Sequence, residues 1–447
     1  MNYESAVRYL LTLGRELAAP TQAASAKFNL ENITVLLERL GRPESAYPSV
    51  HIAGTNGKGS TAAFVESILR RAGFRTGLNT SPHLERINER IQINGKEISD
   101  ELFAEIFTRM HELIEELLAG GLLKAHPTYF ECVTAIAFEA FARERVEFAV
   151  VEVGLGGRLD ATNVLAPVVS VITKIDFDHE NFLGHSLREV AGEKAGILKR
   201  GVPAVIAGQV SEAREVLLGR ARELQCLVME TAEAFVVEDE SMADGFARAR
   251  VMEKASGSRF EIAPRLAGRF QLQNALNAVG CALVLQGKKY KITETDIEEG
   301  IAAAQWPGRI ERLQTRPDIY LDGAHNPGAA RELANFLEEH FRGRRIYMLF
   351  AAMRDKAVDE VTGLLFPHAY EVIFTEARTP RAISAAQLEE MAGHHAERYS
   401  VIAGAEKALE AAIEKARPED AIFVTGSLYL VGQLRAAWRE RVKVARG

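Results

Sequence analysis

The residues best suited to chemistry form the glycine-rich stretch GTNGKGST at positions 54 to 61. Glycines let backbone N–H groups approach phosphate oxygens, Lys58 adds a positive charge, and the hydroxyls can reach Mg²⁺. The standard phosphate-loop pattern would have glycine at Ile52 and Ser or Thr at Gly59. A glycine-rich turn without a ligand is the alternative. The apolar run before it and the helical pattern after it favour a phosphate site.

A second segment, VVEVGLGGRLDATNV at 150 to 164, places Glu152 at the end of a buried apolar strand. Open α/β sheets bind ligands at the carboxyl ends of their parallel strands, so a carboxylate here is a candidate ligand group. A structural hydrogen-bond acceptor is the alternative, because a charge in a buried strand requires a partner.

A third segment, TKIDFDHE at 173 to 180, also follows an apolar strand. It offers four donors: Asp176, Asp178, His179 and Glu180. Mg²⁺ prefers oxygen ligands, so His179 would be an unusual ligand and a structural histidine is the alternative. Further on, Lys194 stands in an otherwise apolar helical stretch, where spacing alone predicts no more than a surface lysine.

A fourth segment, YLDGAHNPGAARELANFL at 320 to 337, ends a strand with Asp322, His325 and Asn326. Pro327 then favours the first turn of a helix. Polar residues at a strand end beside a helix N-terminus indicate a nucleotide or phosphate contact, and a plain capped turn is the alternative. Arg309 in WPGR could bind a phosphate through its forked guanidinium.

The elements around these motifs predict an α/β fold. Nearly continuous apolar runs at 49–53, 148–153 and 168–173 are typical of parallel strands covered on both faces. After Pro307 and Gly308, which mark a boundary, four further strands begin near positions 319, 345, 371 and 421. We expect further helices at 27–40 and 271–286, helical structure over 92–127, and a small peripheral sheet within 228–263, with strands near 234–237 and 259–262.

Composition narrows the function classes. The 447 residues are 47% hydrophobic and 26% charged, as in soluble proteins of two or three domains. A net charge of -7 argues against duplex nucleic acid as a partner, and no run approaches the about 20 apolar residues of a membrane span. Cys132, Cys226 and Cys281 form neither a disulfide framework nor a paired zinc motif. With no export signal evident, we expect a cytoplasmic protein whose partners are small molecules.

Together with SPHLERINERI at 81–91, EKAGI and WPGR, these motifs resemble the folylpolyglutamate synthase/dihydrofolate synthase family of the Mur ligase superfamily. The resemblance covers almost the whole chain, with the motifs in the family order. It implies a P-loop, Mur-ligase-like ATP-binding domain over 1–308 and a smaller Rossmann-like C-terminal glutamate ligase domain over 309–447. The active site would lie in the cleft between them.

The resemblance also implies residue roles. ATP would be bound by Thr55, Asn56, Gly57, Lys58, Gly59, Ser60, Asn274, Arg309 and Asp322. Mg²⁺ would be held by Ser81, Glu152 and His179, and the pterin by Thr128, Tyr129, Phe130 and Asp160. Lys194 matches a lysine that is carbamylated, which turns a cation into an oxygen-bearing anchor. Lys58, Lys194 and His325 would be catalytic, with His325 accepting a proton or binding substrate.

The implied reaction is an ATP-dependent amide-bond ligation. ATP phosphorylates a carboxylate to an acyl phosphate, and the amine of L-glutamate then attacks it. Lys58 and two Mg²⁺ ions would neutralise and align the repelling carboxylate and γ-phosphate. The acceptor would be dihydropteroate, a reduced folate or both, and we expect a monomer.

Two alternatives remain. One is a Mur-type ligase acting on a UDP-linked muropeptide, which the TYFE and RLDATN segments and the lack of a UDP-binding domain before the glycine-rich loop disfavour. The other is a non-catalytic nucleotide-binding regulator, which Glu152, His179 and Lys194 together disfavour. One departure from the family concerns RDK at 354–356, which is followed by AVDE where a second acid is expected.

Overall fold

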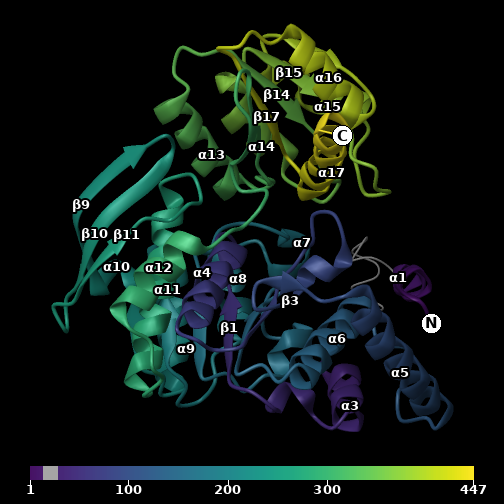
Figure 1. Cartoon of the computed structure of the whole chain (residues 1–447), viewed down its shortest axis with the longest axis vertical. Helices are drawn as coiled ribbons and strands as arrows, with labels where there is room; N and C mark the ends of the chain where they lie inside the picture. Colours follow the sequence, from purple (N-terminus) through teal and green to yellow (C-terminus); the bar gives the residue numbers. More distant parts are fainter. Residues whose placement is uncertain (14–28, 447) are drawn as a thin grey trace.

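The computed structural model describes residues 1–13 and 29–446, and its largest sheet has the order β4-β3-β2-β5-β1-β6-β7-β8 (Figure 1). The six strands from β2 to β8 in that order are parallel, and β3 and β4 are antiparallel at one edge. β1, β5 and β6 are buried along their whole lengths, which confirms the three strands predicted from continuous apolar runs. The strands are β1 (Ser49–Ala53), β2 (Thr76–Asn79), β3 (Ile91–Ile93), β4 (Lys96–Glu97), β5 (Phe148–Glu152), β6 (Val169–Ile172), β7 (Ala204–Ile206) and β8 (Val228–Glu230).

Helices cover both faces of this sheet. One face packs against α4, α11 and α12. The other face packs against α1, α3, α5 and α6, and near β6 and β7 it packs against α8 and α9. The helices are α1 (Tyr3–Thr12), α3 (Glu31–Arg39), α4 (Lys58–Arg71), α5 (Asp100–Ala119), α6 (Tyr129–Arg143), α7 (Glu180–Leu183), α8 (Leu187–Ala195), α9 (Ser211–Glu223), α10 (Thr231–Ala234), α11 (Phe270–Gly287) and α12 (Glu294–Ala303). The predicted helix at 271–286 is confirmed by α11. The one at 27–40 is confirmed from Glu31, and its residues 27 and 28 lie outside the described part.

The predicted small sheet within 228–263 is present as an antiparallel sheet of order β11-β10-β9, at the side of the molecule (Figure 1). Its strands are β9 (Phe235–Ala243), β10 (Phe246–Glu253) and β11 (Arg259–Ile262). The prediction for 92–127 was wrong at its start, because β3 and β4 form a hairpin before α5 begins. Asn94 and Gly95, both with positive φ, make the turn, and this Asn-Gly pair was an unused signal in the sequence.

A third sheet of order β12-β13-β17-β14-β15-β16 draws all its strands from the C-terminal third. They are β12 (Glu311–Gln314), β13 (Asp318–Leu321), β14 (Ile346–Phe350), β15 (Glu371–Phe374), β16 (Tyr399–Val401) and β17 (Ala421–Thr425). The four predicted strands are β13, β14, β15 and β17. The edge strands β12 and β16 were missed because they are short and partly exposed and contain no continuous apolar run. Five helices flank the sheet: α13 (Pro327–His340), α14 (Val358–Leu365), α15 (Ala385–Ala392), α16 (Ala405–Lys415) and α17 (Leu428–Arg446).

The α/β class predicted from the sequence is confirmed, and two mainly parallel sheets face each other across a set of polar contacts. The ends of β1, β5 and β6 carry three of the predicted motifs, and the end of β13 carries the fourth. Among the described residues, no helix is both long and apolar enough to cross a membrane.

Candidate active site

The glycine-rich loop joins the end of β1 to the start of α4 and is fixed by the neighbouring strand. Backbone N–H groups of Thr55 and Asn56 donate to the Lys174 carbonyl, at 2.9 and 3.2 Å. The Thr55 hydroxyl donates to the Asp176 carbonyl at 2.8 Å and accepts from the Asp176 N–H at 3.0 Å. The GTNGKGST and TKIDFDHE motifs are therefore held together as one unit.

Gly57 has a φ of +87°, and a Cβ there would lie 2.1 Å from Asn274 Oδ1. Only glycine fits, so α11 approaches the loop closely and brings Asn274 to it. Lys58 Nζ donates to the Thr55 carbonyl at 3.1 Å. The first N–H groups of α4, together with Lys58, form a helix N-terminus at the end of a parallel strand, an arrangement whose dipole and N–H groups favour an anion. Gly59 lies against the Trp306 ring, and Ser60 is buried.

Lys194 does not lie on a surface, contrary to what spacing alone predicts for it. Its side chain is 4% exposed in α8, and Nζ donates to the Gly54 carbonyl at 2.8 Å. Burial and the nearby Lys58 lower the pKa of Lys194 to about 7, although Asp178 and Asp160 act against this shift. The amine is therefore partly neutral at pH 7, the form that acts as a nucleophile.

Glu152 stands at the end of β5 and is 4% exposed. Its Oε2 accepts the Ser81 N–H at 3.1 Å, so the structure brings these two predicted metal ligands together. Burial raises the pKa of Glu152, while Lys58 and Arg309 act to lower it. The positive groups around this buried carboxylate do not fully compensate the cost of burying its negative charge, and a bound cation would do so.

Arg309 and Asp322 form the edge of the site on the C-terminal sheet. Asp322 accepts backbone N–H groups from Ala324 at 2.9 Å and Ile310 at 3.0 Å. Burial lowers the pKa of Arg309 and raises that of Asp322, and their mutual attraction opposes both shifts. The guanidinium lies against Gly323, where a Cβ would be 2.9 Å from Arg309 Nη1, and the charge of Glu152 on the other sheet acts to raise the pKa of Arg309.

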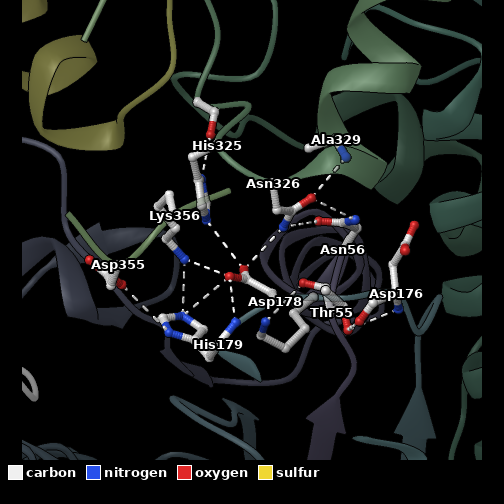
Figure 2. Close-up of polar contacts among 12 residues, drawn as sticks. Thr55, Asn56, Asp176, Asp178, His179, His325, Asn326, Ala329, Asp355 and Lys356 are labelled. Carbon is white, nitrogen blue, oxygen red and sulfur yellow. Dashed lines mark hydrogen bonds and ion pairs between the residues drawn. The ribbon is translucent and has the colours of Figure 1, made fainter. Parts of the chain in front are cut away.

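A polar cluster joins the two sheets around Asp178 (Figure 2). Lys356 Nζ donates to Asp178 Oδ1 at 2.6 Å, and Asn326 Nδ2 donates to Asp178 Oδ2 at 3.1 Å. Asn326 also exchanges hydrogen bonds with Asn56 of the glycine-rich loop, at 3.0 and 3.2 Å. Burial acts to raise the pKa of Asp178, but Lys356 and two histidines outweigh it and hold that pKa well below its usual range.

The two histidines are His179 and His325. His325 Nδ1 lies 2.7 Å from the Gly323 carbonyl, which only accepts, so Nδ1 carries the proton; Nε2 lies 3.6 Å from Asp178 Oδ2. His179, in a left-handed conformation with a φ of +52°, has Nε2 3.2 Å from Lys356 Nζ. Burial lowers the pKa of His179 to about 4, so the ring is neutral.

The sequence analysis missed Lys356 and Asp355, which lies 3.8 Å from His179. The RDK segment was the available signal, but it was noted only as a departure from the family, because AVDE follows it where a second acid beside the lysine is expected. In the fold, the acid beside Lys356 is Asp178, which comes from the other sheet.

Of the four predicted pterin-binding residues, Phe130 and Asp160 contact the GLGG loop. Thr128 caps α6, Tyr129 is buried in the core, and Phe130 is partly exposed. A Cβ on Gly154 would lie 2.4 Å from the Phe130 ring, so the ring and the loop are in contact. Asp160 Oδ2 accepts the Leu155 N–H at 2.9 Å, which fixes the other end of the loop. Phe130 thus presents a partly exposed aromatic ring beside this loop.

Comparisons with known proteins agree with this architecture. Residues 52–282 match the Mur ligase middle domain, and residues 308–428 match the Mur ligase glutamate ligase domain. The dihydrofolate synthase/folylpolyglutamate synthase of Bacillus subtilis is 36% identical over 412 residues, which cover 92% of this chain and 94% of that protein.

Two solved structures are similar over nearly their whole lengths. Mycobacterium tuberculosis folylpolyglutamate synthase complexed with ADP superposes with a TM-score of 0.88 at 33% identity, covering 97% of this chain and 98% of that one. E. coli FolC in complex with DHPP and ADP gives a TM-score of 0.85 at 28% identity, covering 99% and 98%. The chain therefore belongs to the folylpolyglutamate synthase/dihydrofolate synthase family of ATP-dependent Mur ligases.

Proposed function

We propose that this ATP-dependent ligase adds L-glutamate both to dihydropteroate and to the γ-carboxyl group of reduced folates. The observation that carries the proposal is the meeting of three sets of groups at facing strand ends. These are the glycine-rich loop with Lys58, the buried Lys194 and Glu152, and the Asp178 cluster. Relatives and neighbours named for dihydrofolate synthase, folylpolyglutamate synthase and a DHPP complex support both acceptors.

In this proposal residues 1–308 form the ATP-binding domain and residues 309–447 the glutamate ligase domain. The gap between α12, which ends at Ala303, and β12, which begins at Glu311, supports that division. ATP lies along the glycine-rich loop at residues 55–60, with its phosphates on the backbone N–H groups from Gly57 to Ser60, because those of Thr55 and Asn56 donate to the Lys174 carbonyl. Asn274, Arg309 and Asp322 contact the nucleotide from α11 and from the C-terminal side, a placement that the close approach of Asn274 to Gly57 supports.

Mg²⁺ fits the donors that this chain presents, with Ser81 and Glu152 as its oxygen ligands. Their mutual contact and the incompletely neutralised charge of Glu152 support the site. His179 is the third proposed ligand, and its neutral ring is in the protonation state that a metal ligand needs. When bound, the ion would neutralise charge on the phosphates that approach the acceptor carboxylate.

Lys194 would be carbamylated. A neutral amine attacks the carbon of dissolved CO₂, a C–N bond forms as one C–O π bond breaks, and a proton leaves to water. The lowered pKa supplies the neutral amine, and burial beside Lys58 gives the resulting anion a cationic neighbour. The carbamate oxygens could then anchor a metal ion or a substrate.

The reaction follows from these positions. An acceptor carboxylate oxygen attacks the γ-phosphorus of ATP and ADP leaves, while Lys58 reduces the repulsion between the two anions. The glutamate amine then attacks the acyl carbon, and phosphate leaves. His325 is the proposed proton acceptor, because its Nε2 lies 3.6 Å from Asp178 Oδ2 and this carboxylate would stabilise the imidazolium.

The pterin would stack on Phe130, with Thr128, Tyr129 and Asp160 around the GLGG loop. Contacts of Phe130 with Gly154 and of Asp160 with Leu155 support a shared wall. We propose a monomer, because both sheets that supply the site belong to one chain. Three cysteines without disulfides support a cytoplasmic location.

The test is phosphate release by the purified protein with ATP, Mg²⁺ and L-glutamate, using dihydropteroate, a reduced folate monoglutamate, a UDP-muropeptide or no acceptor. Product masses are determined in parallel. We expect dihydropteroate to gain one glutamate and reduced folate to gain one or more. Turnover with reduced folate and not with dihydropteroate would refute the proposed addition of glutamate to dihydropteroate. Turnover with the muropeptide alone, or with none of them, would refute the proposal.

A further inference from the structure

A buried chain of hydrogen bonds leads from the central strand β1 to Asp160. His51 Nε2 lies 2.8 Å from Thr162 Oγ1, and that hydroxyl donates to Asp160 Oδ1 at 2.5 Å. The exposed fractions are 0% for His51, 0% for Thr162 and 6% for Asp160. Neither His51 nor Thr162 has a part in the reaction described above.

The direction of these hydrogen bonds is set by the one proton of the Thr162 hydroxyl. Asp160 Oδ1 also accepts the Thr162 N–H at 3.0 Å, and an ionised carboxylate can only accept, so the hydroxyl proton points to Asp160. Thr162 Oγ1 must then accept from His51, whose proton is on Nε2. Burial lowers the pKa of His51 to about 3, which keeps the ring neutral, and Nδ1 is the nitrogen without a proton.

His51 lies on the face of β1 that leads to the pterin wall. Val50 and Ile52 point to the core beneath α4 and α11, so the alternation of a strand turns His51 towards α6, the helix that carries Tyr129 and Phe130. Its ring occupies the space between the strand and the 3₁₀ turn at Ala161–Val164, which Asp160 caps.

The Asp160 carboxylate is buried, and the hydrogen bonds from Thr162 help to stabilise its charge. Burial raises the pKa of Asp160, and the hydrogen bonds from Thr162 are among the contacts that act against that shift. The other oxygen, Oδ2, holds the Leu155 N–H and so fixes the GLGG loop that packs on Phe130. If the Thr162 hydroxyl rotated away from Asp160, the charged form of the carboxylate would lose a hydrogen bond. The GLGG loop, which the same carboxylate holds through Leu155, would then be less firmly fixed.

We propose that His51 is a positioning residue for pterin binding, which donates to Thr162 and thereby holds the Asp160 carboxylate and the GLGG loop against Phe130. The inference rests on the proposed function, since it assigns Asp160 and Phe130 to the pterin site. His51 touches neither substrate, and it acts through Thr162.

The position of His51 allows a selective test. His51 lies three residues before Gly54, which directly follows the end of β1. A residue that only packs the strand would therefore affect the ATP loop as much as the pterin wall. We would measure KM for the pterin acceptor and for ATP in wild type, His51→Leu and His51→Gln. Gln keeps an N–H donor of similar reach, and Leu removes it.

We expect His51→Leu to raise the acceptor KM by about fivefold to tenfold, the worth of one hydrogen bond, with the ATP KM nearly unchanged. His51→Gln should recover most of the loss. Thr162→Val should match His51→Leu, and the double variant should be no worse than either single one, because all three break the same chain.

Equal increases in both KM values, or no recovery with Gln, would overturn the proposal. If His51→Leu does not fold, the same two KM values are compared between Thr162→Val and Thr162→Ser. Serine keeps the hydroxyl, so only the valine variant should raise the acceptor KM. If the wild-type enzyme turns over neither pterin acceptor, the proposed function is refuted. If the wild-type enzyme is active but substitution of His51 leaves the acceptor KM unchanged, only the role of His51 is refuted.

Discussion

Replacement of Lys194 tests the most consequential feature of the site, a buried lysine with a pKa near 7. At that pKa about half of the amines are neutral at pH 7, whereas at the ordinary value roughly one in three thousand would be. The fold therefore raises the concentration of the reactive amine about a thousandfold. This gain makes reaction with dissolved CO₂ practical at neutral pH.

The direction of the pH dependence follows from the same shift. The unfolded chain binds more protons at this lysine than the folded one between pH 7 and 10.5, so its contribution to folding stability rises with pH across that window. At constant dissolved CO₂, carbamylation and activity should likewise rise as the pH passes through about 7.

The assay combines carbon NMR with isotopically labelled bicarbonate and steady-state kinetics. We expect a carbamate signal in wild type and none in Lys194→Arg or Lys194→Ala, with kcat in both variants lowered by at least about a hundredfold. Lys194→Ala should regain part of its activity with a short carboxylate such as acetate, and none with methylamine.

The refuting result is specific. If Lys194→Arg keeps its activity, or if methylamine and not acetate rescues Lys194→Ala, the lysine acts as a cation. The reasoning from its lowered pKa to a carbamate is then wrong.

Three further outcomes are expected. Glu152→Gln should raise the Mg²⁺ concentration for half-maximal activity by about tenfold or more, because it replaces a buried anionic ligand; a metal titration of the initial rate checks this. Lys58→Ala should lower kcat by about a hundredfold to a thousandfold in a fixed-time assay of phosphate release, since it removes the cation that the loop itself carries. Lys356→Met should lower the free energy of unfolding in urea by about 3 kcal/mol at pH 7, because it leaves Asp178 buried and unpaired. The matched double variant with Asp178→Asn should recover much of this. The low pKa of Asp178 means that the contribution of the pair is present above about pH 4 and fades only as the pH falls further.

Much of the fold and the site could be predicted from local sequence. The runs that became β1, β5 and β6 are continuous in apolarity because both faces of a parallel sheet are covered, and this pattern needs no knowledge of neighbours. The glycine-rich loop was predicted for a similar reason, since strand, turn and helix follow one another within a few residues. The turn at Asn94 and Gly95 was equally local and should have been found.

The groups that define the chemistry depend on residues far apart in the chain. Lys194 reaches the Gly54 carbonyl from 140 residues away, and Lys356 reaches Asp178 from 178 residues away. Spacing within a helix says whether a lysine is on the apolar face, but its pKa depends on the depth and charge of the surroundings that packing creates.

The amino-acid sequence by itself thus determined which strands and loops form, and where along the chain the polar groups stand at strand ends. Only the tertiary structure decided that Lys194 is buried, that Lys356 pairs with Asp178, and that His51 reaches Asp160 through Thr162. The physical reason is that local sequence patterns reflect backbone preference and burial. The protonation state of a buried side chain and its ion-pair partner depend instead on which distant residues are packed beside it.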